Sequence, residues 1–417
     1  AAFSSASTSP LRPSEFSYFR GSRCEFVPLQ RPSSILWEQG QLMMTAAERS
    51  PTGAHAIKHL CRFFVAAALF LGLFAGFNFV IDPLQIFHRP WITPARYSSD
   101  PRFGNAGLIR SQEFDTAFMG TSYSVQLRQS EIDQRLGGKS LKLAISGGTS
   151  KEQNVVLTAA LTRHPKRIVW QMDDYMFRNS GDVDAYMPAD LYQMNLKGLA
   201  EYLLNLRTAR ESLWMVLRSL KPLQRVAHVM LITGYLTFNE TDVMELNTFP
   251  SNIDPASVFN SARAKAAFEQ QVKSPHLLSA GIDYASMVVN FDRDALKLIK
   301  DNPDTQFTIF PPSSILHWAA MRDASPQTLA DIYKLSQHEL TQLTRLPNAT
   351  VHDFRAVEQI THDLDNYTDT IHYSPQVNRR ILSFIAAGEH QVDRINPTAS
   401  IGSLRGQVER YNVITLR

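Results

Sequence analysis

The sequence predicts an α/β fold built on a parallel sheet, with a helical insertion in its middle and one membrane-spanning helix before it. Three observations predict this. Short apolar runs that end in Gly, Ser or Asp alternate with helical segments, a long apolar run lies near the N-terminus, and leucines recur at helical spacing between two blocks of alternation. A chain of 417 residues can bury a large core.

The composition narrows the class of protein. A hydrophobic share of 44%, a charged share of 19% and a net charge of +3 are ordinary for a globular protein and exclude disorder for most of the chain. The sequence carries no basic stripe with interleaved aromatics, so we expect no nucleic-acid partner. It also carries no His-Glu-x-x-His, no Cys-x-x-Cys and no phosphate-binding loop, so we expect no metal and no cofactor. Cys24 and Cys61 are not placed to form a disulfide that would stabilise a domain.

The N-terminal segment, residues 1–62, is expected to be disordered and cytoplasmic. Its first part is rich in Ser, Pro and Arg without an apolar period. We expect the natural start at Met43 or Met44; a transit peptide is the alternative, and acidic residues in the stretch weigh against it.

Residues 63–81 form the predicted transmembrane anchor. They are almost entirely apolar and just long enough to cross a hydrocarbon core of about 30 Å. Lys58, His59 and Arg62 precede the run and Asp82 follows it, so the positive-inside rule predicts a single-pass membrane protein with its N-terminus in the cytoplasm and its main domain outside. A cleaved signal peptide is the alternative, but the run offers no convincing cleavage site.

A linker, residues 82–113, leads to the first half of the α/β core, residues 114–178. Strands are expected at 115–119, 141–145 and 167–172, with a helix at 151–162. Strand ends of parallel sheets collect functional groups, so the turns after these strands are the first candidates for a site.

The helical insertion spans residues 179–289. Its leucines recur at helical spacing through residues 196–220. A packed subdomain is the expected structure; the alternative is that part of it forms a lid or rests on the membrane, because Trp214, Met215 and the run 226–238 are unusually apolar.

The second half of the core, residues 290–390, resumes the alternation. Helices are expected at 293–301, 326–343 and 374–387, and strands at 306–310 and 350–354. The C-terminal tail, residues 391–417, shows no strong period.

Two short motifs could carry chemistry. Ser122, in Gly120-Thr121-Ser122, follows the first strand, where free backbone N–H groups can stabilise an oxyanion; a helix-capping serine is the alternative. Asp369 and His372 are spaced so that the carboxylate can hold the imidazole Nδ1 and leave Nε2 to take a serine proton. A capped helix start with a surface histidine is the alternative for this pair.

Together and in this order, the motifs resemble those of the SGNH hydrolase superfamily, the GDSL-type esterases. Ser122 stands at the family's nucleophile position, Gly147 in Ile145-Ser146-Gly147 matches its second block, and Asp369-Thr370-Ile371-His372 matches its last. The resemblance implies a three-layer, flavodoxin-like parallel sheet. It also implies that Ser122, Asp369 and His372 are catalytic and that Gly147 contributes to the oxyanion hole.

One position departs from the family pattern. Where the family places an oxyanion-hole asparagine, this chain has Asp173 in Trp170-Gln171-Met172-Asp173-Asp174. An ionised carboxylate cannot donate a hydrogen bond to an oxyanion. The hole would then rest on backbone N–H groups, Asp173 would serve another role, or the activity would be lost.

The resemblance, with the anchor, implies a serine esterase or O-acyltransferase that acts on acyl esters of a cell-envelope or secreted polysaccharide. It also implies a location in the inner (cytoplasmic) membrane, with the main domain periplasmic or otherwise extracytoplasmic. Its expected partners are the membrane, an acylated glycan substrate and a membrane protein that supplies acyl groups. The alternative is a catalytically inactive component that binds or assembles an exopolysaccharide. His317 and Trp318 could line a sugar pocket or belong to the core.

Overall fold

The computed structural model describes residues 51–92, 100–124, 126–179, 187–193, 195–219, 255–312 and 314–412. It divides into two compact units, Ala1–Ala67 and Ala68–Arg417. The described part of the first unit belongs to helix α2 (Pro51–Ile81). The expected start at Met43 or Met44, the run 226–238 and most of the predicted disordered segment lie outside the described residues.

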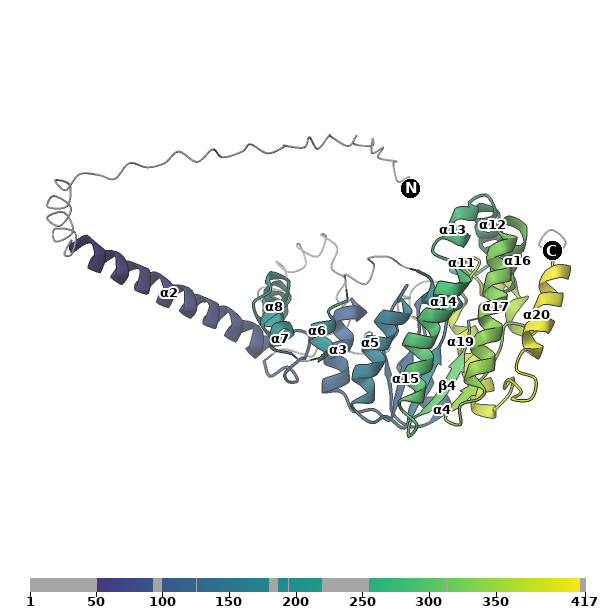
Figure 1. Ribbon diagram of the computed structural model, residues 1–417, viewed down its shortest axis with the longest axis horizontal. Coiled ribbons are helices and arrows are strands. Elements are labelled where there is room, and N and C mark those ends of the chain that lie inside the picture. Colours follow the sequence, from purple (N-terminus) through teal and green to yellow (C-terminus); the bar gives the residue numbers. More distant parts are fainter. Residues whose placement is uncertain are drawn as a thin grey trace, which may run out of the picture. The chain divides into compact units, whose positions relative to one another are not determined.

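Helix α2 is long and apolar enough over His55–Ile81 to cross a membrane. Its residues Leu69, Phe70 and Leu73 are 63%, 66% and 76% exposed, as expected for side chains that face lipid. The helix begins earlier than the predicted anchor, because residues 51–62 continue the same α-helical backbone. The prediction of a helix able to span a membrane is therefore confirmed within the part of the chain that the structure describes (Figure 1).

The second unit contains a five-stranded parallel sheet, which confirms the predicted α/β class. The strand order is β2-β1-β3-β4-β5. The strands are β1 (Thr116–Met119), β2 (Ser140–Lys142), β3 (Arg167–Gln171), β4 (Gln306–Phe310) and β5 (Ala349–Val351). The chain reverses its direction of travel across the sheet beside β1, and ligands of such sheets bind at the carboxyl ends of the strands near this point.

Strand β2 is shorter than predicted, but the residues that follow it still hydrogen-bond to β1 and to the turn after β1. The Leu143 N–H donates to the Phe118 carbonyl at 2.8 Å, and the Ile145 N–H donates to the Gly120 carbonyl at 2.9 Å. The turn after Ile145 is thereby brought to the same sheet edge as the turn that holds Ser122.

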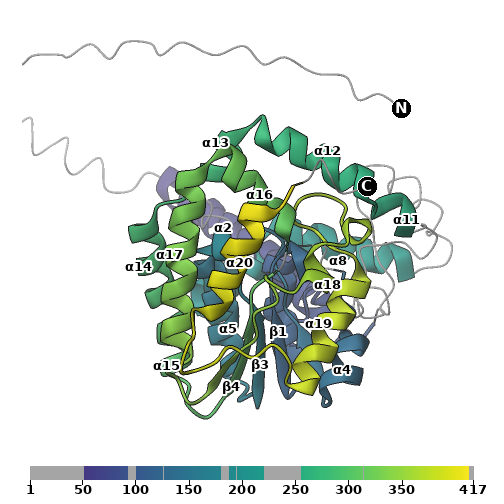
Figure 2. The same cartoon turned by 90° about the vertical axis from the view of Figure 1, so that its right-hand side faces the viewer.

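Helices cover both faces of the sheet (Figure 2). On one side, α4 (Gln129–Leu136) packs against α19 (Pro375–Ala387). On the other side lie α5 (Ser150–Leu161), α14 (Tyr284–Phe291), α15 (Lys297–Lys300) and α17 (Pro326–Leu343), with a π-helical turn, η6 (Asp292–Leu296), between α14 and α15. All of β1 is buried, and Phe118, Trp170 and Phe310 fill the core between the layers.

Two segments differ from their predicted irregular structure. The predicted linker contains helix α3 (Pro101–Ser111), which Asp100 caps and whose residues 104–109 are buried. Within it Gly107 lies so close to the Leu84 carbonyl that a Cβ would stand 1.5 Å from that oxygen. The C-terminal tail contains α20 (Ala399–Arg410), whose buried Ile401, Leu404 and Val408 face α16 (Ile315–Ala324). Helix α3 buries a run made mostly of small residues, and α20 has a narrow apolar stripe, which is why periodicity did not reveal them.

The insertion is helical, as predicted. Its described helices are α6 (Ala189–Gln193), α7 (Leu196–Leu203), α8 (Leu206–Ser219), α11 (Pro255–Val258), α12 (Ser261–Val272) and α13 (Pro275–Ser279), followed by α14. Helices α6 and α7 pack together, and α12 packs on α16 at the other end of the sheet. Short elements complete the described chain: η1 (Ser122–Ser124), η2 (Asp174–Phe177), α18 (Glu358–Thr361) and η7 (Leu364–Asn366).

Candidate active site

The turn after β1 presents Ser122 at the carboxyl edge of the sheet. Ser122 opens η1, directly after Gly120 and Thr121. A Cβ at Gly120 would lie 2.4 Å from Ser124 Oγ and 3.0 Å from Gln171 Oε1, so a larger residue here would have to displace these side chains. Ser122 itself is half-buried, which leaves its hydroxyl reachable from one side.

A tight loop before α19 carries Asp369 and His372. Antiparallel pairing of Tyr367 with Tyr373 closes the loop, and the Thr368 N–H donates to the His372 carbonyl at 3.0 Å. Inside the loop, Asp369 Oδ1 accepts from the backbone N–H groups of Ile371 at 2.8 Å and His372 at 2.7 Å. These two hydrogen bonds hold the carboxylate of Asp369 in place independently of its contact with the imidazole.

The structure brings Ser122, His372 and Asp369 into one hydrogen-bonded chain. His372 Nδ1 lies 2.7 Å from Asp369 Oδ2, and His372 Nε2 lies 2.8 Å from Ser122 Oγ. An ionised carboxylate only accepts, so Nδ1 carries the proton; in a neutral ring Nε2 is then an acceptor, and the Ser122 hydroxyl donates to it. This is the arrangement that activates a serine as a nucleophile.

The electrostatics of Asp369 favour its charged form. Burial opposes ionisation, but the hydrogen bonds and charge of His372 and the two loop N–H groups outweigh it, so the pKa of Asp369 lies below its ordinary value. The carboxylate therefore remains negative and can stabilise an imidazolium on His372.

Gly147 lies in an exposed turn after β2, at the edge that also carries Ser122. The Gly148 N–H donates to the Ile145 carbonyl at 2.9 Å, and Gly147 has a φ of 64°. A positive φ at this position of a turn is the reason for a glycine.

Asp173 follows β3 and caps η2. Its Oδ1 accepts from the Tyr175 N–H at 3.0 Å. Burial raises the pKa of Asp173 to about 7, although the hydrogen bond from Tyr175 and the charge of His372 both act to lower it. At neutral pH a large share of Asp173 is therefore protonated and carries an O–H donor. Burial thus makes a protonated, hydrogen-bond-donating form of this carboxyl accessible near neutral pH, beside the ionised form.

Side chains around the triad hold its two loops together. Gln171 Nε2 donates to the Tyr373 hydroxyl at 2.6 Å, and Asn378 Nδ2 donates to the Tyr123 carbonyl at 3.1 Å. The Tyr123 ring lies 5.6 Å from the His372 ring between centroids. The hydroxyl of Ser314 donates to the Thr370 carbonyl within the histidine loop. The serine turn and the histidine loop are thus tied to each other and to β3.

A buried ion network lies behind Asp173, and sequence reasoning missed it. Arg355 binds Asp353 through two bonds of 2.9 and 3.0 Å, contacts Asp174 at 3.4 Å and donates to Ser336 at 2.8 Å. Glu339 completes the group, and burial and the negative charge of Asp174 raise its pKa. The available signal was Asp353-x-Arg355 at the end of an otherwise apolar strand, which is unusual unless the charges are paired.

One hollow adjoins the site, and a second begins two residues after Gly147. A small one, with a volume of about 20 Å³, is lined by residues that include Tyr123, Asp173, His317 and Trp318. Burial lowers the pKa of His317 to about 4, so its ring is neutral. A larger groove of about 790 Å³ starts at Thr149, just past Gly147, and runs between α5 and the π-helical turn.

Among the residues that the structure describes, no group of three or more His, Cys, Asp or Glu is arranged to hold a metal ion. Comparison with protein-family models and with curated proteins finds no match for this chain.

Proposed function

We propose that the protein is a membrane-anchored, extracytoplasmic serine esterase or O-acyltransferase of SGNH-like type, acting on acyl esters of a cell-envelope or secreted polysaccharide. The observation that carries the proposal is the hydrogen-bonded chain Ser122–His372–Asp369, with contacts of 2.8 and 2.7 Å. Ser122 lies 250 residues before His372 along the chain, and a serine hydroxyl, an imidazole and a carboxylate rarely meet in this order without a chemical reason.

The geometry supports a two-step acyl transfer. Ser122 Oγ attacks the ester carbonyl as its proton passes to His372 Nε2, while Asp369 stabilises the imidazolium. The tetrahedral intermediate then releases the sugar alcohol, which takes the proton from His372, and leaves the acyl group on Ser122. Water, or a second sugar hydroxyl, gives its proton to His372 and attacks the acyl group, so that hydrolysis or transfer restores the serine.

The oxyanion donors in this proposal are the backbone N–H groups of Ser122 and Gly147 and the neutral carboxyl of Asp173. A pKa of about 7 supports the last of these, since the protonated acid can replace the amide of an asparagine. Such a donor operates best below neutral pH.

The two hollows support the substrate class. The cavity of about 20 Å³ has room for one small group, which favours a short acyl chain such as acetyl over a long one. The groove of about 790 Å³ is lined mainly by polar side chains, among them Asn154, Asn290, Lys151 and Arg178. The lining also includes Asp294 and Asp301, which pair with Arg293 and Lys297, and a polar lining of this kind suits a polysaccharide.

Labelling with a serine-reactive fluorophosphonate tests the catalytic assignment. The full chain in detergent should be labelled, and Ser122→Ala and His372→Ala should each abolish labelling. Ser383→Ala and His276→Ala, which change exposed residues of the same types, should label like the native protein. Labelling that survives Ser122→Ala would refute the assignment.

The alternative is a non-catalytic polysaccharide-binding or assembly component, and the acidic residue at position 173 is the observation that favours it. Binding of an acidic glycan that Ser122→Ala leaves unchanged, in a protein that neither reacts with fluorophosphonate nor turns over an acetyl ester, would support this alternative.

The proposed orientation places the N-terminus in the cytoplasm because Lys58, His59 and Arg62 precede the apolar run. Fusions after Arg417 test it. A periplasmic phosphatase should be active there and a cytoplasmic reporter inactive; the opposite pattern would reverse the orientation.

A further inference from the structure

The C-terminal end of α2 is tied to the insertion through a buried amide. Asn78 is fully buried; its Nδ2 donates to the Leu203 carbonyl at 2.8 Å, and its Oδ1 accepts from Ser212 Oγ at 3.0 Å. Asn78 lies within the apolar run, about 4.5 Å before the end of the helix. An amide at that depth needs partners, because hydrocarbon offers none. Helices α7 and α8 supply them.

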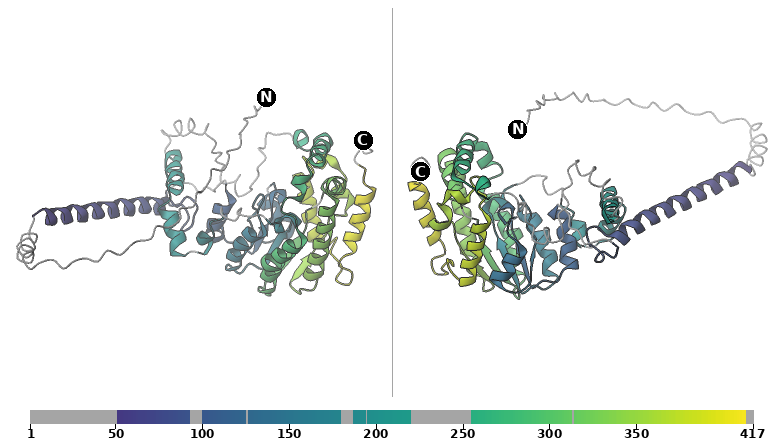
Figure 3. Two further views of the ribbon diagram at one scale, coloured as in Figure 1. Left: turned by 45° about the horizontal axis from the view of Figure 1, so that its top comes forward. Right: turned by 180° about the vertical axis from the view of Figure 1, so that it is seen from behind.

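A second tie follows directly after the helix. The Tyr202 hydroxyl donates to Asp82 Oδ1 at 2.8 Å and accepts from the Leu84 N–H at 3.1 Å. The carboxylate of Asp82 also accepts three backbone N–H groups of the following turn, at 2.7 to 2.9 Å. The end of α2 and the helices beside it therefore form one hydrogen-bonded unit, and the views in Figure 1 and Figure 3 agree on this placement.

The segment after α2 folds back so that the exposed ring of Trp91 lies beside the same end of the helix. The Trp91 ring stacks on His88 at 3.7 Å and lies 6.2 Å from Phe79, while His88 Nε2 lies 2.8 Å from the Phe79 carbonyl. Trp91 is nevertheless 64% exposed. Tryptophan at the last turn of a spanning helix is typical of the membrane–water interface.

Helix α8 exposes leucines while burying polar side chains. Leu206 and Leu213, seven residues apart and so on one face, are 79% and 51% exposed, whereas Thr208 and Ser212 are buried. Leu204 and Ile92 are also exposed. We call Trp91, Ile92, Leu204, Leu206 and Leu213 the interfacial collar. An apolar surface around the end of an apolar helix is costly in water.

We propose that the interfacial collar inserts into the headgroup layer of the phospholipid bilayer at the C-terminal end of α2, with α8 lying on the membrane surface. Lipid is the occupant because the segments that carry the collar are held against the end of α2 by the contacts of Trp91 with Phe79 and of α7 and α8 with Asn78, and because α2 itself exposes Leu69, Phe70 and Leu73. The inference rests on α2 crossing a membrane, as proposed above, and not on the hydrolase chemistry.

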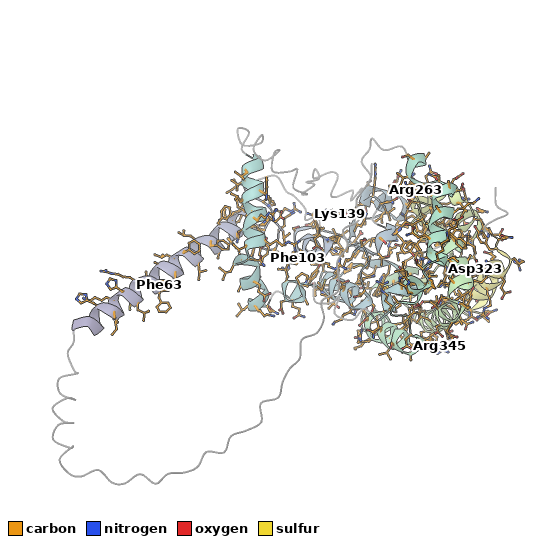
Figure 4. The ribbon with its side chains drawn as sticks, turned by 90° about the horizontal axis from the view of Figure 1, so that it is seen from above. Phe63, Phe103, Lys139, Arg263, Asp323 and Arg345 are labelled. Atoms are coloured by element: carbon orange, nitrogen blue, oxygen red, sulfur yellow. The ribbon has the colours of Figure 1, made fainter. Side chains whose placement is uncertain are left out.

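The test uses the full chain with Cys24→Ser and Cys61→Ser, and one fluorophore-labelled cysteine at a time. Leu206→Cys and Leu213→Cys report on the collar, Leu69→Cys is the lipid-facing control, and Arg345→Cys is the water-facing control. Figure 4 shows Arg345 well away from Phe103, whose ring lies 4.3 Å from the Arg207 guanidinium of α8. The proteins are reconstituted in phosphatidylcholine vesicles, with and without phosphatidylglycerol, that contain nitroxide-labelled lipid.

We expect nitroxide lipid to quench labels at Leu206 and Leu213 several-fold more than the label at Arg345, with Leu69 quenched most. Quenching at Leu69 but not at the collar would overturn the collar inference alone, including the case where the collar labels are shielded by a second copy or another protein. No quenching at Leu69 would overturn the membrane anchor and the collar together. Fluorophosphonate labelling of the same samples reports separately on the proposed chemistry.

Discussion

Asn378, in the first turn of α19, donates its side-chain N–H to the backbone carbonyl of Tyr123 at 3.1 Å. The contact joins the residue after the proposed nucleophile to the helix that follows the proposed base. It therefore fixes the separation of the two loops, and with it the contact between Ser122 and His372.

Replacing the amide of Asn378 should destabilise the protein and weaken the positioning of Ser122 relative to His372. Asn378→Ala leaves the Tyr123 carbonyl without the amide, and a lost buried hydrogen bond lowers the free energy of unfolding by about 1–3 kcal/mol. Urea unfolding measures this change, and fluorophosphonate labelling should slow in parallel. Ser383→Ala, on an exposed face of the same helix, should change the free energy by less than about 0.5 kcal/mol. Labelling at the native rate in Asn378→Ala would show that the contact does not position the serine.

The negative charge of Asp369 should contribute more to the reactivity of Ser122 than the size of its side chain does. Asp369→Asn keeps the side-chain size, but its amide can donate to His372 Nδ1 and stabilise the tautomer that cannot accept the serine proton. The labelling rate should fall by a factor on the order of 10⁴. Asp304→Asn, in an exposed turn before β4, is the matched control and should label normally. A loss of less than about tenfold at position 369 would count against the triad.

Asp173 should make activity and stability depend on pH in a defined direction. Its folded pKa of about 7 is raised above the ordinary value of 3.8, so its contribution to stability is present at low pH and is lost as the pH rises toward 7. An asparagine stays neutral throughout. The melting temperature of Asp173→Asn should therefore rise relative to that of the native protein between pH 5 and pH 8.

The same substitution should change the pH profile of the reaction. At pH 8 only about a tenth of a carboxyl with this pKa is protonated, so the rate of Asp173→Asn relative to native should increase up to about tenfold between pH 6 and pH 8. Esterase or labelling rates at both pH values give this ratio. A ratio that does not change with pH would remove Asp173 from the oxyanion hole.

Arg355 should be essential for folding stability although it does not touch the triad. Arg355→Ala leaves Asp353, Asp174 and Glu339 buried without their cation, a change that destabilises buried ion pairs by about 3–5 kcal/mol. Arg345→Ala, on the exposed surface, should have little effect. Guanidinium unfolding curves of the two variants make the comparison, and equal midpoints would contradict the assigned role.

Part of this architecture follows from local sequence pattern. Helix α17 has its predicted bounds and β4 matches its predicted strand, because both combine strong periodicity with clear flanking turns. Helices α3, α16 and α20 were not predicted, because α3 buries mainly small residues, α16 is buried over most of its length and α20 has only a narrow apolar stripe. The order of Gly120-Thr121-Ser122 and Asp369-x-x-His372 along the chain was enough to propose one site, but not to bring its atoms together.

By itself, the sequence determined the α/β class, the helix able to span a membrane and the residues that could form a triad. These depend on the spacing of apolar residues and on short motifs, which are local properties. Only the tertiary structure decided that Ser122, His372 and Asp369 meet within hydrogen-bond distance, that burial raises the pKa of Asp173 to about 7, that Arg355 sits among buried carboxylates and that Asn78 binds α7 and α8. Each of these depends on which distant side chains share a desolvated space, and that is set by packing across the sheet rather than by neighbours in the chain.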